Sequence, residues 1–180
     1  TEEDHTIVKN NYFKQVIEPL IRATFNINEL SNLQTTNGNT QVSERNIINN
    51  IREAFNNNNI CFEEAGSQQP YDFRNVGPNN SYQSLDYLEI KKTNGNIIYL
   101  NDTIPTAGVK YIVFVTSRKN PRILFLDGSD LLNGSESWIY EYQNAINNLK
   151  DTFCRGKNAS NLPGIMQVYA RPTYKADIST

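Results

Sequence analysis

The first third of the chain carries apolar residues at the three- and four-residue steps that are typical of amphipathic helices. These steps predict a helical segment over residues 6–33, with a break or kink near Glu18 because Pro19 follows it. A second helix is predicted to begin at Ser43, a residue type that is favoured at N-caps. The apolar stripe of this second helix consists of Ile47, Ile48, Ile51 and Phe55.

Beyond residue 59 the apolar residues alternate with polar ones or form short runs, a pattern that is typical of β-strands. Strands are predicted over residues 60–65, 71–76, 87–93, 96–100, 111–117 and 122–126. The run 111–117 is almost wholly apolar. It therefore indicates a buried central strand, with 122–126 as its hairpin partner.

The remaining signals complete the predicted architecture. Asn94 and Gly95 form a strong signal for a hairpin turn between two of the strands. A helix is predicted over residues 135–153, and a final strand within 165–178. This order predicts an α+β fold in α/β/α layers, with a central mixed β-sheet flanked by helices. We expect one domain with an N-terminal helical segment, a core and a C-terminal helix and strand, over residues 1–42, 43–126 and 127–180.

Composition adds limits on what the protein can bind. The chain has 180 residues and a net charge of −2, which excludes a uniformly basic surface that would coat nucleic acid or membrane. After Glu64, however, 12 basic residues outnumber 10 acidic ones, so this part can face a polyanion. No apolar run approaches the roughly 20 residues that a membrane-spanning helix needs. Cys61 and Cys154 are predicted to be buried free thiols in a reducing compartment, which favours a cytoplasmic location.

The segment with the clearest chemical pattern runs from residue 67 to residue 94. Because side chains alternate along a strand, Leu88 and Ile90 are expected in the core, with Glu89 and Lys91 together on the other face. If strands 71–76 and 87–93 pair as a hairpin, Asp72 meets Glu89 beside Lys91. Two converging carboxylates are hard oxygen ligands that suit Mg²⁺, and the lysine can hold or deprotonate a water molecule. This pattern favours hydrolysis of a phosphodiester.

The same residues resemble a known family. Pro70-Tyr71-Asp72 followed by Glu89-Ile90-Lys91 resembles the PD-(D/E)xK nuclease motif, most closely as used in Type II restriction endonucleases. The resemblance covers residues 43–126, with the proline displaced by one position because Tyr71 stands before Asp72.

The resemblance implies a restriction-endonuclease-like core that binds Mg²⁺ through Asp72, Glu89 and the carbonyl group of Ile90. It implies that Lys91 serves the attacking water. It also implies a homodimer that cuts both strands of double-stranded DNA at a short specific sequence, with the N-terminal segment available for dimerisation.

Many members of this family place a further acid on the helix that precedes the motif. At 100° per residue Glu44 aligns with the apolar stripe of the second helix, whereas Glu53 lies about 180° away. We therefore expect Glu44 to approach the metal. The alternative is that Glu44 simply stabilises the first turn through the helix dipole.

Possible DNA contacts are more widely spread. Asn, Gln, Lys and Arg side chains can bond to base edges or phosphates. The candidates for DNA binding are Gln68, Gln69, Asn101, Asp102, Lys110, Arg118 and Lys119.

Three other interpretations remain open at this stage. Glu89 and Lys91 can form an exposed salt bridge of little consequence, with Asp72 a turn residue. A repair or junction-resolving nuclease can use the same three residues on a different DNA structure. A non-enzymatic, secreted and glycosylated binding protein is suggested by four Asn-x-Ser/Thr sequons, at Asn79, Asn101, Asn133 and Asn158.

Overall fold

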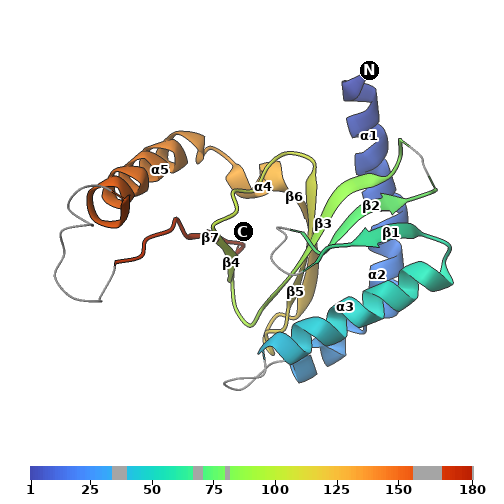
Figure 1. Ribbon diagram of the computed structural model, residues 1–180. Helices are drawn as coiled ribbons and strands as arrows, with labels where there is room; N and C mark the ends of the chain where they lie inside the picture. Colours follow the sequence, from blue (N-terminus) through green and yellow to red (C-terminus); the bar gives the residue numbers. More distant parts are fainter. Residues whose placement is uncertain (34–39, 67–70, 80–81, 156–167, 180) are drawn as a thin grey trace.

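The computed structural model describes residues 1–33, 40–66, 71–79, 82–155 and 168–179 (Figure 1). An N-terminal run of helices is followed by a five-stranded mixed sheet, a two-stranded sheet and further helices. This is an α+β fold, as the order of elements predicted.

The N-terminal helices begin earlier than the apolar spacing predicted. Helix α1 (Glu2–Tyr12) begins beside Thr1, whose hydroxyl accepts the Asp4 N–H in a capping box. A π-helical turn (Phe13–Ile17) then leads into α2 (Glu18–Thr24).

The break or kink expected near Glu18 is not a break, because Ile17 and Glu18 both keep right-handed helical backbone angles. The irregularity is instead the π-helical turn that directly precedes Glu18 and Pro19. A 3₁₀ segment (Ile27–Leu33) ends this helical region.

Helix α3 (Thr40–Asn57) begins three residues before the predicted N-cap, so the prediction of a start at Ser43 was wrong. Residues of capping type also precede Ser43 in the polar run 35–40, and cap preference alone cannot choose among them. The apolar stripe was predicted correctly for its buried members, Ile47, Ile51 and Phe55.

The main sheet has the strand order β1-β2-β3-β5-β6. Its strands are β1 (Cys61–Glu64), β2 (Phe73–Gly77), β3 (Leu85–Thr93), β5 (Val109–Val115) and β6 (Arg122–Asp127). Neighbouring strands are antiparallel except β3 and β5, which are parallel. The predicted hairpins β2–β3 and β5–β6 are both present, and β5 is the buried central strand that its apolar sequence indicated.

One face of this sheet packs against α1, α2 and α3 (Figure 1). Alternation along β3 and β5 directs Leu88, Ile90, Ile112 and Phe114 into this core. Phe55 of α3 contacts the β2 residue Phe73 with ring centroids 5.5 Å apart. The helices thus hold the inner side of the strands that carry the predicted acids.

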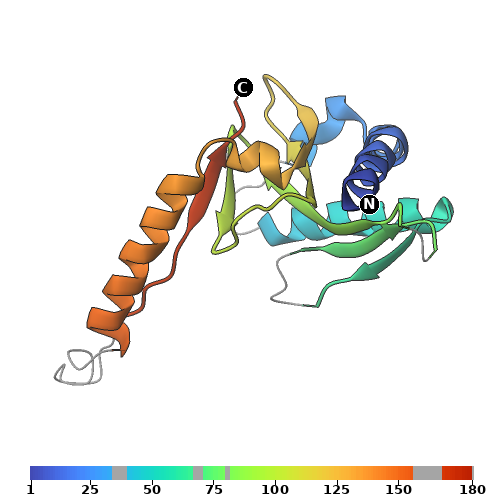
Figure 2. The ribbon, with the colours of Figure 1, turned by 90° about the horizontal axis from the view of Figure 1, so that it is seen from above.

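The opposite face is covered by a second small layer. Strand β4 (Ile97–Asn101) pairs with β7 (Tyr174–Asp177) in the two-stranded sheet. Helices α4 (Gly128–Leu132) and α5 (Glu136–Lys150) belong to the same side, and α5 projects away from the main sheet (Figure 2).

The hairpin predicted at Asn94 and Gly95 does not form, because β4 does not pair with β3. Strand β3 already pairs with β2 on one edge and with β5 on the other, and the Thr116 N–H extends the second pairing to the carbonyl of Thr93. No edge of β3 is left for a further strand, so β4 pairs with β7 instead.

Two expectations from composition can also be compared with the structure. Within the described ranges, no helix is long and apolar enough to cross a membrane. Both cysteines are free thiols, but Cys61 is exposed, so the prediction that it is buried was wrong. The reason is that β1 is the edge strand of the main sheet.

The loop between β4 and β5 is fastened where it meets Gly128. A Cβ atom on Gly128 would lie 2.0 Å from the Thr106 carbonyl oxygen, so Gly128→Ala forces the backbone apart. We expect Gly128→Ala to lower the free energy of unfolding by about 1–3 kcal/mol or more, measured by urea denaturation. Gly95→Ala is the control, because a Cβ there meets nothing within 4 Å. Equal unfolding midpoints for the two variants would contradict this close packing.

Candidate active site

Asp72 is bound to β3 through both its backbone and its side chain. Its N–H donates to the carbonyl of Leu88 at 3.0 Å, and its Oδ2 accepts the N–H of Ile90 at 2.7 Å. These two bonds place Asp72 beside residues 88–90, just before β2 begins. The first acid of the predicted site therefore lies next to the strand that carries the second acid.

Glu89 and Lys91 lie together on β3, as the alternation predicted. The Lys91 Nζ atom is 3.1 Å from Glu89 Oε1, and the two side chains are only 18% and 15% exposed. Leu88 and Ile90 are buried in the core on the opposite face of the strand. The interpretation as an exposed surface ion pair does not fit this burial.

Burial weakens the ionisation of both acids, and for Glu89 the neighbouring charge of Asp72 adds to this effect. Burial, followed by the negative charge of Asp72, raises the pKa of Glu89 to about 7, although Lys91 opposes this shift. Burial also raises the pKa of Asp72, opposed by the hydrogen bond from Ile90 and by the charge of Lys91. The site thus concentrates more negative charge than Lys91 alone compensates.

Glu44 is exposed on α3 but lies near this site. Its negative charge contributes to the raised pKa of Asp72. It also opposes the lowering of the Lys92 pKa, whose main cause is burial. Glu53 is exposed on the same helix, nine residues further along. The charge of Glu44 thus acts on Asp72, as we expected, but its side chain is exposed like that of Glu53 and not buried with the apolar stripe of α3.

The donors suit a divalent cation that prefers oxygen. Within the described residues, no three His, Cys, Asp or Glu side chains gather closely enough to hold a metal. Asp72 and Glu89 nevertheless supply two carboxylates whose repulsion a cation would relieve. The N–H and C=O of a strand residue point to the same side, so the Ile90 carbonyl points to the edge where Asp72 lies. Mg²⁺ commonly binds through one or two carboxylates and retains several waters, so this set of donors fits it.

Three tyrosines beside the acids were not identified from the sequence as part of the site. Tyr111 pairs in register with Glu89 across β3 and β5 and is 1% exposed. Burial raises the pKa of Tyr111, and the Glu89 charge adds to this effect. The rings of Tyr71 and Tyr87 are in contact at a tilted angle, with ring centroids 4.7 Å apart. The register between β3 and β5 places Tyr111 beside Glu89. The sequence alone does not give this register, because β3 and β5 are neighbours only if β4 belongs to another sheet.

The proposed DNA contact of Lys110 was wrong. Its side chain is buried, and its ammonium group bonds to Asp127 at 2.7 Å and to the side chain of Asn10. A lysine that is paired and buried in this way presents no charge to DNA. Lys110 follows a polar loop in the sequence, and nothing in that pattern indicates its acidic partner 17 residues later.

The other predicted contact residues occupy varied positions. Asn101 and Asp102 are exposed at the end of β4, and Asp102 forms an ion pair with Arg171 at 2.8 Å. Arg118 and Lys119 are exposed at the turn between β5 and β6. Gln68 and Gln69 lie outside the described residues.

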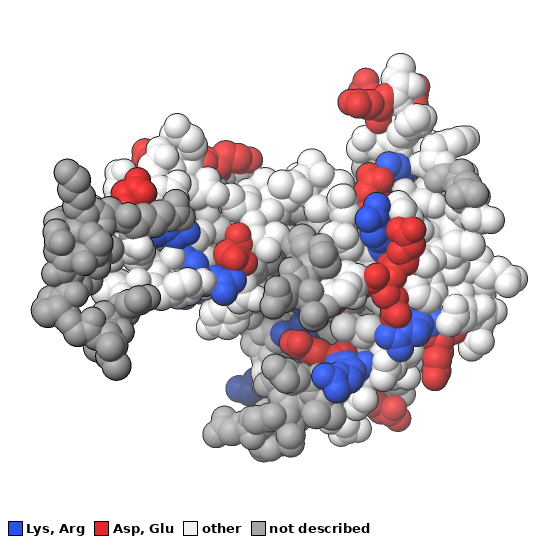
Figure 3. Space-filling view, in the orientation of Figure 1, with Lys and Arg blue, Asp and Glu red and all other residues white. Residues whose placement is uncertain are grey.

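Surface charge over β1, β2 and β3 is mixed. Acidic and basic side chains alternate along this side of the molecule (Figure 3). Ion pairs on these strands and the adjoining helices include Lys9–Asp86, Arg52–Glu64 and Arg74–Glu63. The two charges within each pair neutralise each other, so the basic side chains here do not form a continuous positive surface for a polyanion.

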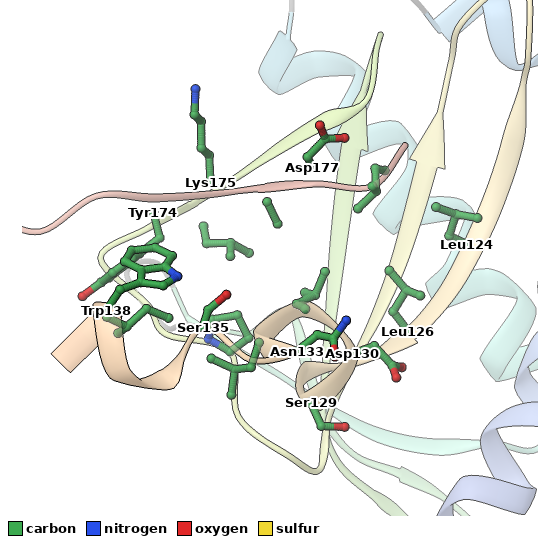
Figure 4. Close-up of a pocket in the computed structure, with 17 residues that line it drawn as sticks. Leu124, Leu126, Ser129, Asp130, Asn133, Ser135, Trp138, Tyr174, Lys175 and Asp177 are labelled. Atoms are coloured by element: carbon green, nitrogen blue, oxygen red, sulfur yellow. The ribbon is translucent and has the colours of Figure 1, made fainter. Parts of the chain in front are cut away.

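A separate cavity lies away from the carboxylates. It has a volume of about 720 Å³ and is lined by residues of β6, α4, α5 and β7. Trp138 and Tyr174 lie at one end and Leu124 and Leu126 at the other, while Lys175 points away (Figure 4). Its lining includes none of Asp72, Glu89 and Lys91, so it is separate from the candidate active site.

Comparisons with protein-family models, with curated proteins and with solved structures find no match to this chain. The assignment of a function therefore depends on the geometry of the site.

The raised pKa of Glu89 predicts how the metal-free protein responds to pH. Glu89 has a pKa of about 7 when folded and an ordinary value of 4.5, so the folded state binds more protons between these values. The free energy of unfolding should therefore fall as pH rises through this range, by up to about 3 kcal/mol. Glu89→Gln cannot ionise and should flatten the dependence, measured by urea denaturation in EDTA across this range. Glu53→Gln, at an exposed position, should behave like the unaltered protein. An unchanged slope for Glu89→Gln would contradict the assignment.

Proposed function

We propose that this protein is a Mg²⁺-dependent, sequence-specific endonuclease that cuts double-stranded DNA, of the Type II restriction class. The observation that carries this proposal is the convergence of Asp72, Glu89 and Lys91 in one half-buried polar site on β2 and β3. Their order and spacing match the motif of PD-(D/E)xK nucleases. The antiparallel β1-β2-β3 arrangement and the parallel β3–β5 pair also support it.

Asp72, Glu89 and the Ile90 carbonyl would hold the metal. When bound, Mg²⁺ supplies Lewis-acid chemistry that offsets the charge developing on phosphate oxygens. The two carboxylates would fix the position of the metal ion, because Asp72 is held against β3 by its hydrogen bond from the Ile90 N–H. Burial strengthens these interactions, since the surroundings screen charge less than water does.

Lys91 acts on the attacking water and on the charge of the transition state. Its ammonium group lies 3.1 Å from Glu89, one of the two acids that would hold the metal. A cation there stabilises negative charge as it builds up on the phosphate. Glu44 adds an acid at the edge of the site, where it can orient water without entering the buried pair.

DNA would bind along the end of the sheet where β3 and β5 terminate. Lys91 pairs with Val113, so Arg118 lies five residues further along the chain, at the next turn. Arg118 and Lys119 form no ion pair within the described part of the chain, so they are available for phosphates. Cutting both strands needs two such sites, which a homodimer would supply.

The alternative of a secreted, glycosylated binding protein has less support. Asn79, Asn101 and Asn133 are exposed, as glycosylation would need. That function gives no role to the buried pair of Glu89 and Lys91. We therefore favour the nuclease.

Lys91→Ala is the central test of the proposed chemistry. We expect Mg²⁺-dependent cleavage of unmethylated phage DNA to fall by about 10²–10⁴-fold, the usual loss for a positioned catalytic group. DNA binding, measured by anisotropy without divalent ions, should be nearly unchanged. Lys175→Ala is the matched control, because Lys175 is exposed on β7 and belongs to the lining of the separate cavity (Figure 4).

The outcomes of this test separate the related functions. Discrete, reproducible DNA fragments support the restriction class, whereas nicking only at branched or damaged DNA supports a repair or junction-resolving nuclease.

Asp72→Ala should lose the response of cleavage to added Mg²⁺. Full cleavage by Lys91→Ala, or an unaltered metal response of Asp72→Ala, would overturn the proposed site.

Two glutamates of α3 provide a matched pair for a second test. Glu44→Gln removes the charge that acts on Asp72 and should lower the rate of cleavage by about tenfold or more. Glu53→Gln removes an equal charge from an exposed position of the same helix and should leave the rate unchanged. Rates under single-turnover conditions give the comparison. Equal rates for both variants would remove Glu44 from the active site.

A further inference from the structure

A small cavity adjoins the candidate active site. Its volume is about 230 Å³, below the roughly 300–1,000 Å³ of pockets that bind drug-sized ligands. It is lined by Tyr71, Tyr87, Thr103, Ile104, Thr106, Val109 and Tyr111. A single ring system is therefore a better match in size than a larger molecule.

The aromatic walls of this cavity lie next to the residues proposed to cleave DNA. Tyr71 directly precedes Asp72 in the chain. Tyr87 is two residues before Glu89 on the same face of β3, a separation of about 7 Å. Tyr111 lies alongside Glu89 in the register of β3 and β5. A phosphate held at the carboxylates would thus place its neighbouring base within reach of the cavity.

We propose that this cavity binds one unpaired or extruded nucleobase next to the phosphate that is cleaved. This inference rests on the proposed nuclease function and specifies the form of DNA that the site accepts. Enzymes that need access to one nucleotide can take its base out of the stack and hold it against aromatic side chains. Tyr71 and Tyr87 offer such a surface, with ring centroids 4.7 Å apart and an interplanar angle of 40°.

The chemistry of the lining favours a neutral planar ring. Among the residues that the structure describes, the lining consists of aromatic, aliphatic and threonine residues and includes no charged side chain. A phosphate or a sugar alone would find little to bond there, whereas a base can stack on the tyrosine rings. The Thr103 and Thr106 side chains add hydroxyl groups that can bond to polar atoms at the edge of a base.

The loop between β4 and β5 makes this cavity a defined site. Thr103, Ile104 and Thr106 belong to this loop and form one wall of the cavity, which residues of β3 and β5 also line. The Thr103 N–H donates to the carbonyl of Leu100 at 3.1 Å, and Thr106 packs on Gly128. The wall is therefore held in position before DNA arrives.

The test compares three labelled duplexes that share one sequence. One has a single unpaired adenine, the second has an abasic analogue at that position, and the third is fully paired. The full chain is titrated against each in EDTA, and fluorescence anisotropy gives the affinity. We expect the duplex with the unpaired adenine to bind about 5- to 100-fold more tightly than the abasic duplex, the range for stacking of one base on aromatic side chains.

Matched tyrosine variants locate the effect. Tyr87→Leu keeps an apolar side chain but removes a ring of the cavity, and it should abolish the preference for adenine over the abasic analogue. Tyr71→Leu should do the same, which covers the case in which one variant fails to fold. Tyr99→Leu is the control, because Tyr99 is 63% exposed on β4 and does not line the cavity.

The outcomes distinguish this inference from the function on which it rests. Cleavage that needs Asp72 and Lys91, together with equal affinity for the adenine and abasic duplexes, overturns the base-binding cavity and retains the nuclease. A preference for adenine that Tyr87→Leu abolishes, without any cleavage by the unaltered protein, supports the cavity and overturns the nuclease. A preference that survives in both Tyr87→Leu and Tyr71→Leu overturns the cavity.

Discussion

The two hydrogen bonds between Asp72 and β3 are the constraint on which the candidate site depends. One joins backbone to backbone, and the other joins the Asp72 carboxylate to the Ile90 N–H. Together they hold an acid from the end of a loop against a rigid strand. They oppose the cost of bringing the two acids together, since burial raises the pKa of both and the Asp72 charge adds to the raised pKa of Glu89.

The folded core offsets this electrostatic cost. Leu88 and Ile90 are buried on the inner face of the same strand whose outer face carries Glu89 and Lys91. The apolar burial of these two side chains favours the register that keeps the acids together, since a slip of one residue would exchange the faces. The polar site is thus stabilised by the core beneath it, and placement on strands gives it more precision than a loop would.

Local sequence pattern predicted the parts of the site that depend on one or two adjacent elements. Alternation was sufficient to separate Glu89 and Lys91 from Leu88 and Ile90, since strand geometry allows only two faces. The helical phase similarly distinguished Glu44 from Glu53.

The parts that failed depend on competition between distant elements. The signal at Asn94 and Gly95 describes a turn, but it does not say whether an edge of β3 is free to accept the next strand. The burial of Lys110 depends on Asp127 and Asn10, which lie far from it in the sequence. The start of α3 was missed because several capping residues occur in succession.

The pairing of β4 with β7 affects the order in which the molecule can be completed during synthesis. All the residues proposed to act on the phosphate, from Glu44 to Lys91, leave the ribosome well before Tyr174–Asp177. The β4 strand, which leads into the outer wall of the small cavity, finds its partner only when this late segment emerges. A nascent chain can therefore pair the strands that carry Asp72, Glu89 and Lys91 before the β4–β7 pair that borders the loop of the small cavity is able to form.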